Sequence, residues 1–352
     1  MARAFDFERE NLTAVEQSDM KLKLGIIGLP SDWQQRYLPA LRVLHDRFDV
    51  VGVYNSVAKI ADNAARQLET EAQSSFRELI RRDEVDAILV LSTDWYGLVP
   101  IQAACEYGKA VYCGSEVDFA PEAVHELSSN VDQAGIAFMA EFPKRYAPAS
   151  LRLKELIATR LGPPEMLFCH KRLKKEDRRG DRSPAGRLSR ELMEQVDWCS
   201  YLVGRRPESV QAVAHTLDGR AANVDYQAMS VLYPAEGDKP AAIAQISCGS
   251  YIKDSWEEAI SFRPQAAVQV CCQGGLAFID LPNGLTWFDE SGRHQESLES
   301  EIGVGQQLLS QFHRAVTSLL RKMGDLDDVT LNLRILQAAQ RSILDNRAVE
   351  LN

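Results

Sequence analysis

The segment that most constrains the fold is a hydrophobic strand followed by a tight turn and the start of a helix. Residues 22–41 read LKLGIIGLPSDWQQRYLPAL. Such a unit binds a dinucleotide when its turn reads G-x-G-x-x-G, because the second glycine lets the backbone approach the pyrophosphate. Here Gly28 occupies the first glycine position, but Pro30 and Trp33 occupy the other two. The segment therefore predicts the scaffold of a dinucleotide-binding fold with an altered phosphate loop.

Strands and helices alternate regularly over the first part of the chain. Apolar runs typical of buried strands occupy residues 22–29, 48–55, 85–92, 110–114 and 136–142. Between them, apolar side chains recur at helical spacing in residues 33–47, 56–68, 74–83, 99–109 and 120–135. This alternation predicts an α/β domain, a doubly wound parallel sheet, over residues 21–145. Residues 1–20 are expected to form an N-terminal extension.

Strands dominate the second part of the chain. Strand-like runs occupy residues 165–173, 209–217, 225–234, 241–251, 267–274, 275–282 and 284–290. Helical patterns occupy residues 149–162, 190–204, 304–323 and 329–346. Clustered strands with one helical face predict an α+β domain with an open, mostly antiparallel sheet over residues 146–352.

The charge balance and the cysteines exclude several classes of protein. A net charge of -10 argues against a nucleic-acid partner. No apolar run approaches the ~18 residues of a membrane span, and the N-terminus lacks the basic and apolar segments of a signal peptide. The 7 cysteines include no C-x-x-C pair, and the 6 histidines show no metal-ligand spacing. We therefore expect a reduced, cytoplasmic protein without a bound metal.

An ordered set of short segments resembles the glucose–fructose oxidoreductase / inositol dehydrogenase / MocA (Gfo/Idh/MocA) family, and the resemblance runs from Lys21 to Leu351. The segments are GIIG, YLPAL, VDAILVLST, GKAVYC, FPKRYAP, LKELIATRLGPPE, DWCSYLVG and GLAFIDLPNGLTWFD. The resemblance implies an N-terminal Rossmann domain, a C-terminal open sheet and a nicotinamide cofactor held in the cleft between them. It also implies a homo-oligomer formed through the second sheet.

The chain departs from this family where the family's chemistry lies. The family commonly has a lysine in an E-K-P segment, and Ser115 stands at that position. A later helix of the family commonly carries G-x-H-x-x-D. In this chain Glu194 stands at the histidine position, and Asp197 matches the aspartate. Family members often have a histidine shortly after the strand that corresponds to residues 85–92, and Gly97 stands at that position here. The chain is thus expected to be a divergent member.

We expect NADP or NAD as the cofactor, although Pro30 removes an N–H donor from the phosphate loop and Trp33 adds bulk to it. Asn55 and Ser56 replace the acidic residue that would bind the ribose 2′-hydroxyl, and Lys59 lies one turn further on. This arrangement favours NADP, unless Asn55 is a plain loop residue. The predicted cofactor-binding residues are Gly28, Leu29, Pro30, Asp32, Trp33, Asn55, Ser56, Ser92, Thr93, Asp94, Tyr96 and Glu116. Tyr96 is equally compatible with simple packing.

Acid–base chemistry needs a group whose pKa lies near neutrality. The candidates are Glu194 and Asp197, three residues apart on one helix face, together with Lys144 and Arg145. Two close carboxylates would raise the pKa of one of them. The alternative is that Asp197 caps or braces the contact expected between the two domains and that Glu194 is solvated.

The segment 170–190 is strongly basic in an otherwise acidic chain, with nine lysines and arginines among its residues. It would form a cationic lip that attracts an anionic substrate. The alternatives are a solvated loop or an arm that pairs with another subunit.

These observations predict an atypical NAD(P)-dependent oxidoreductase that transfers hydride to or from a polar small molecule, such as a sugar or polyol derivative. The competing prediction is a non-catalytic sensor or assembly subunit that has kept the fold and lost turnover.

Overall fold

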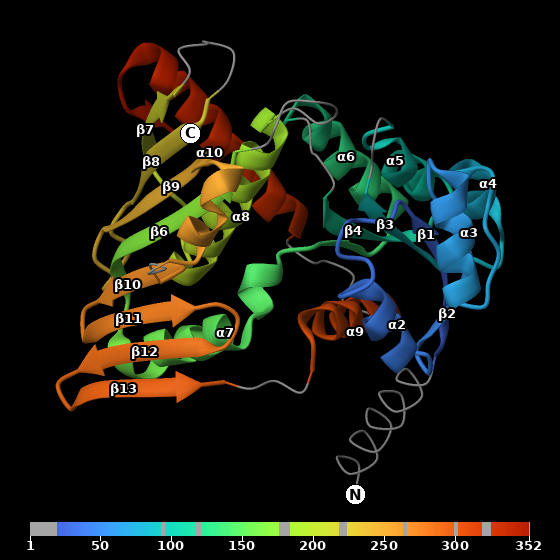
Figure 1. The fold of residues 1–352 in the computed structure, drawn as a ribbon, viewed down its shortest axis with the longest axis horizontal. Coiled ribbons are helices and arrows are strands. Elements are labelled where there is room, and N and C mark those ends of the chain that lie inside the picture. Colours follow the sequence, from blue (N-terminus) through green and yellow to red (C-terminus); the bar gives the residue numbers. More distant parts are fainter. Residues whose placement is uncertain are drawn as a thin grey trace, which may run out of the picture. The chain divides into compact units, whose positions relative to one another are not determined.

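The computed structural model describes residues 20–92, 96–116, 121–175, 184–217, 224–262, 266–298, 302–318 and 325–351. The chain divides into two compact units (Figure 1). The first runs to Pro143 and includes Glu301–Thr330. The second comprises Lys144–Ser300 and Leu331–Asn352.

The first unit is built on a five-stranded parallel sheet in the order β2-β1-β3-β4-β5. Its strands are β1 (Leu22–Ile27), β2 (Phe48–Tyr54), β3 (Ala87–Ser92), β4 (Ala110–Glu116) and β5 (Phe138–Ala140). Its helices are α2 (Tyr37–Val43), α3 (Ala58–Gln67), α4 (Phe76–Arg81), α5 (Val99–Glu106), α6 (Pro121–Ala134) and α9 (Val304–Thr317). Every residue of β3 is buried, as a central parallel strand requires. The predicted parallel sheet is confirmed.

The helix after β1 begins later than the sequence predicts. We expected it to start at Trp33, but α2 begins at Tyr37, after a run of turns. The N–H of Trp33 donates to the carbonyl of Pro30, and those of Gln35 and Arg36 donate to the carbonyl of Asp32. These short-range hydrogen bonds form tight turns in place of the first helical turns.

The second unit is built on a nine-stranded sheet in the order β13-β12-β11-β10-β6-β9-β8-β7-β14. Its longer strands are β6 (Pro164–Lys174), β7 (Ser209–His215), β8 (Tyr226–Tyr233) and β9 (Ala242–Ile252). The shorter ones are β10 (Val268–Cys272), β11 (Gly275–Asp280), β12 (Gly284–Asp289), β13 (Gly292–Ser297) and β14 (Val349–Glu350). β6 and β9 pair in parallel, and the other neighbouring pairs are antiparallel, so the predicted mostly antiparallel sheet is confirmed.

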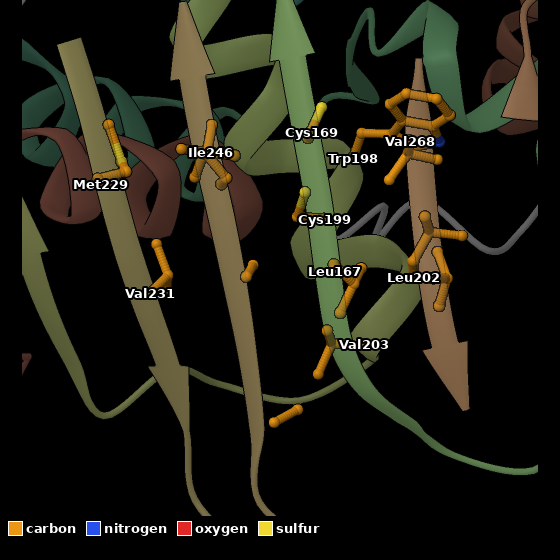
Figure 2. Close-up of a cluster of buried hydrophobic side chains, with 14 of the residues drawn as sticks. Leu167, Cys169, Trp198, Cys199, Leu202, Val203, Met229, Val231, Ile246 and Val268 are labelled. Carbon is orange, nitrogen blue, oxygen red and sulfur yellow. The ribbon is translucent and has the colours of Figure 1, made fainter. Parts of the chain in front are cut away.

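Helices α7 (Pro148–Leu156) and α8 (Pro184–Val203) pack on one face of this sheet (Figure 1). Figure 2 shows the resulting core, in which apolar side chains of α8 meet those of β6, β8, β9 and β10. Trp198 is the largest fully buried side chain, and its indole N–H donates to the Ser150 hydroxyl at 3.0 Å. The core therefore fixes the rotation of α8 about its axis.

The C-terminal helices do not follow the linear division at residue 145 that the sequence suggests. Helix α9 packs on α2 in the first unit, and α10 (Asp325–Asp345) begins in the first unit and continues into the second. Two close contacts hold α9 there. A Cβ on Gly305 would lie 2.7 Å from the carbonyl oxygen of Arg36, and the rings of Phe312 and Tyr112 meet at 5.5 Å. The chain thus returns to its first unit after building the second sheet.

Candidate functional site

The first glycine of the altered loop is required by packing within the first unit. Gly28 has a φ of +75°, in the left-handed region that favours glycine. Its N–H donates to the carbonyl of Tyr54 at 2.9 Å, and a Cβ at this position would collide with the backbone of Ser92. Gly28 therefore lets the ends of β1 and β3 approach closely.

The loop that follows, residues 29–36, is closed by its own side chains. Trp33 is only 5% exposed and stacks on Tyr37 with a ring-centroid distance of 6.4 Å. Its indole N–H is buried and has no hydrogen-bond partner among the described residues. Buried donors in native proteins are nearly always hydrogen-bonded, so an unpaired one marks a place for the oxygen of a water or a ligand. The loop therefore fits a phosphate or ribose oxygen of a dinucleotide through a side-chain donor, while Pro30 offers no N–H.

The other predicted cofactor residues of this unit lie along the carboxyl edge of the sheet. Ser92 ends β3, and its backbone pairs with Glu116 at the end of β4. The side chain of Glu116, and the whole of Thr93 and Asp94, lie outside the described residues. In open parallel sheets, ligands bind at this edge.

Asn55 and Tyr96 have mainly local partners. The Asn55 side chain is buried, and its Oδ1 accepts from the N–H of Val57 at 2.9 Å, which forms a turn after β2. Tyr96 is 5% exposed and donates its hydroxyl to the carbonyl of Ser92. Its ring packs against Tyr54 and Phe76 with centroids 6.2 Å and 5.4 Å away. These contacts match the packing alternative for Tyr96, whereas Ser56 lies exposed beside the turn.

The second unit contains a separate polar cluster, in which a short helical turn at Pro143–Tyr146 meets α8. Lys144 Nζ lies 3.2 Å from Glu194 Oε2 and 4.0 Å from Glu191 Oε2. Burial by itself lowers the pKa of Lys144, but the carboxylates of Glu194 and Glu191 outweigh it and leave the pKa raised. Lys144 is therefore a cation at neutral pH and acts as a hydrogen-bond donor.

A second ion pair adjoins the first along α8. Arg145 Nε donates to Asp197 Oδ2 at 2.8 Å, and a terminal nitrogen of the same guanidinium contacts Oδ1. Asn332 Nδ2 also donates to Oδ1, at 3.0 Å. The guanidinium lies over the ring of Tyr201, 5.5 Å from its centroid. Asp197 is fully buried, so this bidentate pair is fixed in one geometry.

The structure thus brings together all four predicted catalytic residues, Lys144, Arg145, Glu194 and Asp197, as two ion pairs. Sequence reasoning missed three further members, Glu191, Tyr201 and Asn332. Glu191 and Tyr201 follow the three- and four-residue spacing of α8 and were detectable in principle. Asn332 lies on α10, and nothing in its local sequence links it to Asp197.

Only part of the basic segment 170–190 is described, because residues 176–183 lie outside the described residues. Within the described part, Arg172 donates to the carbonyls of Ala259 and Phe262 at 3.2 Å and 3.3 Å. Arg172 is thus used within the fold. The cationic lip stays a prediction.

The described residues contain neither a membrane-spanning helix nor a metal-binding cluster. In the described ranges, no helix has the length and apolar character needed to span a bilayer. Over the same residues, no group of three or more histidine, cysteine, aspartate or glutamate side chains is arranged to hold a metal ion.

Residues 22–142 match the Gfo/Idh/MocA family, described as an oxidoreductase family with an NAD-binding Rossmann fold. The match covers the Rossmann unit, and the chain as a whole is similar to distant members of this family. The predicted resemblance is therefore confirmed. The Rossmann unit is of the NAD(P)-binding type found in the family.

The proteins to which the chain is similar are distant from it in sequence. Inositol 2-dehydrogenase of Rhizobium meliloti is 25% identical over 173 residues, which cover 48% of this chain and 52% of that protein. An uncharacterized oxidoreductase of Streptococcus pneumoniae is 25% identical over 157 residues, 43% of this chain and 42% of that protein. The match thus spans about half of each curated relative. The aldose-aldose oxidoreductase of Caulobacter crescentus, crystallised with glycerol, has the same fold, with a TM-score of 0.80 at 15% identity over 94% of this chain and 100% of that chain.

Proposed function

We propose that this chain is an NAD(P)-dependent oxidoreductase that acts on a polar small molecule, such as a sugar or polyol derivative. The proposal rests on two adjacent ion pairs in the second unit, Lys144–Glu194 and Arg145–Asp197. Both carboxylates lie on α8. Relatives named for inositol and aldoses support this substrate class. The orphaned indole N–H of Trp33 supports a ligand at the phosphate loop.

The first ion pair provides the proton chemistry. When bound, the nicotinamide supplies or accepts the hydride at the substrate carbon. Lys144 Nζ donates a hydrogen bond to the substrate oxygen and stabilises the negative charge that develops there. Glu194 Oε2, 3.2 Å from Nζ, receives the hydroxyl proton during oxidation and returns it during reduction.

The second ion pair orients the substrate. Asp197 accepts hydrogen bonds from Arg145 and Asn332 and is buried, so we assign it to holding Arg145 in place. Arg145 then binds a second oxygen of the substrate. Fixed donors at two points select a polyhydroxylated molecule in one orientation.

The charge of the cluster bears on the substrate. Three carboxylates, those of Glu191, Glu194 and Asp197, are matched by three cations, Lys144, Arg145 and Lys154, the last of which lies over the Tyr201 ring 5.0 Å from its centroid. This balanced charge suits a neutral sugar or polyol. An anionic substrate would need the additional cations of the basic segment 170–190.

One observation favours the competing function, a non-catalytic sensor or assembly subunit. Trp33 occupies a glycine position of the family's phosphate loop and is buried there, which narrows the space beside the backbone. A protein that had lost its cofactor would tolerate this substitution. Measurement of cofactor binding separates the two functions.

The test is titration of the full chain with NADPH and with NADH, followed by thermal unfolding and tryptophan fluorescence. Binding raises the melting temperature by mass action. No acidic side chain stands at positions 55 and 56 to repel a 2′-phosphate, and Lys59 lies one turn further on, so we expect NADPH to bind more tightly. If neither cofactor raises the melting temperature at millimolar concentration, the oxidoreductase proposal fails and the non-catalytic function stands.

Activity on a panel of sugars and polyols then tests the assigned roles. Proton-transfer groups typically contribute about 10²–10⁴-fold to rate. We expect Lys144→Met and Glu194→Gln each to lower kcat/KM by about 100-fold or more. The matched control is Glu191→Gln, one turn away and 4.0 Å from the same ammonium group, which we expect to cost less than about 10-fold. Full activity of both test variants would remove these residues from the reaction.

We also propose that the protein assembles as a homo-oligomer through the sheet face opposite α7 and α8. A row of apolar side chains crosses four strands there, since Met166, Cys271, Leu276 and Phe288 are neighbours in register. Met166 and Phe288 are each 41% exposed, and Phe168 on the same face is 44% exposed. A contiguous apolar face of this kind usually meets another protein surface.

A further inference from the structure

Among the described residues of the first unit, the most completely buried charge belongs to Glu141, directly after β5. Its side chain is fully buried, and its backbone N–H donates to the carbonyl of Cys113 at 2.8 Å. Carboxylate Oε2 accepts hydrogen bonds from the hydroxyls of Tyr37 at 2.5 Å and Tyr112 at 2.8 Å. Oε1 forms an ion pair with Arg36. No part of the proposed chemistry uses this residue.

Burial of a carboxylate is expensive unless its hydrogen-bonding capacity is filled and its charge is paired. The charge of Glu141 is paired with the Arg36 guanidinium, and its Oε2 accepts from two hydroxyls. Removal of one partner from such a group leaves a buried acceptor or charge without its hydrogen bond or counter-charge, which destabilises the fold. The conformation of the partners is therefore strongly fixed by Glu141.

Two of the three partners lie where the phosphate loop ends and α2 begins. Arg36 precedes α2, and Tyr37 is its first residue, whereas Tyr112 lies in the sheet on β4. Helix α2 has no side-chain cap at its N-terminus, so no local hydrogen bond of that type fixes its start. Glu141 supplies the missing constraint from the far edge of the sheet.

The constraint extends backwards into the loop. Arg36 also lies 3.3 Å from the Asp32 carboxylate, and its backbone N–H donates to the Asp32 carbonyl. The Trp33 ring stacks on Tyr37, within 18° of parallel. Glu141 thus contacts Arg36, which binds Asp32, and Tyr37, which stacks on Trp33. Through these two residues it constrains the loop.

We propose that Glu141 is the positioning residue of the phosphate loop: it sets the conformation of residues 29–36 in which the protein receives its cofactor. The loop contains no glycine after Gly28, so its shape is imposed by side chains and not by backbone freedom. The identity of the ligand as a dinucleotide rests on the proposed function. The effect of Glu141 on the loop conformation rests only on the contacts described above.

Three variants of the full chain separate the contacts. Glu141→Gln keeps an acceptor but removes the charge that pairs with Arg36. Tyr37→Phe removes one hydroxyl on the loop side and keeps the ring that stacks on Trp33. Tyr112→Phe removes a hydroxyl from the same carboxylate on the sheet side, keeps the ring contact with Phe312, and is the matched control.

Two measurements are made on each variant: hydrogen–deuterium exchange of the backbone amides, and the Kd for NADPH and NADH by direct titration. We expect Glu141→Gln and Tyr37→Phe to raise exchange in residues 33–38 by about tenfold or more, while exchange in β3 stays as in the wild type. The Kd for cofactor should rise by a similar factor, and Tyr112→Phe should change both by much less. If Glu141→Gln does not fold, Tyr37→Phe carries the test, because it keeps the ion pair.

The outcomes distinguish this inference from the proposed function. Unchanged exchange in the loop of both test variants overturns the inference even if the wild type binds cofactor normally. Faster exchange with an unchanged Kd also overturns it, since the loop conformation would then not matter to the ligand. Absence of wild-type binding to either cofactor overturns the proposed function and, with it, the cofactor role of Glu141. A merely structural role would lower stability without a selective change in Kd.

Discussion

At the scale of single residues, His313 on α9 shows how burial changes the chemistry of a side chain. Its Nε2 bonds the carbonyl oxygen of Met20 at 2.8 Å, so Nε2 carries the hydrogen, and the ring packs edge-on against Phe48 at 5.4 Å. The side chain is 5% exposed, and burial lowers its pKa. The unfolded chain, with a histidine pKa of about 6.5, therefore takes up this proton first as the pH falls.

A pH dependence of stability follows from this difference. The contribution of His313 is fully present above about pH 6.5 and is lost as the pH falls from there through the lower pKa of the folded state. We expect His313→Gln, which keeps an N–H donor and cannot become charged, to lose less free energy of unfolding between pH 7.5 and 5 than the wild type. Urea unfolding at the two pH values measures this, with the exposed His45→Gln as control. Equal pH dependence in wild type and His313→Gln would contradict the assignment.

At the scale of elements, the junction of β1 and β3 depends on the absence of a side chain at Gly28. An alanine there meets a positive φ, which costs ~1–2 kcal/mol. Its Cβ also collides with the Ser92 backbone, and overpacking of this kind costs ~1–3 kcal/mol. Gly97→Ala is a matched control, since Gly97 also has a positive φ (54°) but a Cβ there would have nothing within 4 Å. We expect a clearly lower urea midpoint for Gly28→Ala than for Gly97→Ala, and equal midpoints would show that the collision is relieved at no cost.

Most of the elements could be predicted, because apolar periodicity reports burial. The five strands of the parallel sheet are apolar runs, and α8 and α10 show helical spacing over most of their length. β13 was not predicted because its sequence, GRHQES, contains no apolar side chain and the strand forms through backbone pairing with β12 at the sheet edge. The start of α2 was misplaced because the turns at Pro30 and Asp32 compete with helical hydrogen bonds. Propensity alone does not resolve such a local competition.

For the candidate site, the residues could be predicted from the sequence, but their pairing could not. The spacing of Glu194 and Asp197 on one helix was visible in the sequence, and Lys144 and Arg145 came from the resemblance to the family. The pairing itself was not predictable, since it depends on how the turn at Pro143–Tyr146 meets α8. The role of Glu141 was likewise hidden, because its partners lie 29 and 104 residues away in the sequence.

At the scale of the whole molecule, the proposed assembly follows from how the second sheet distributes its side chains. Helices cover one face, and the other carries Met166, Phe168 and Phe288 with more than a third of each side chain exposed. The rings of Phe278 and Phe288 meet edge to face at 6.2 Å, which adds an aromatic contact to the same face. A stable interface buries about 800 Å² on each partner. We therefore expect the second copy to cover all four strands of the apolar row.

We expect light scattering coupled to gel filtration to give the mass of at least two copies for the wild type. Phe168→Asp places a charge in the middle of the proposed interface, where it would be desolvated without a partner, and should shift the mass towards that of one chain. Ile60→Asp is the matched control, because Ile60 is 45% exposed but lies on α3 in the other unit. A wild type that runs as a single chain at every concentration would contradict the assembly. A mass lowered equally by both substitutions would place the interface elsewhere, because a contact through this sheet face must distinguish Phe168 from Ile60.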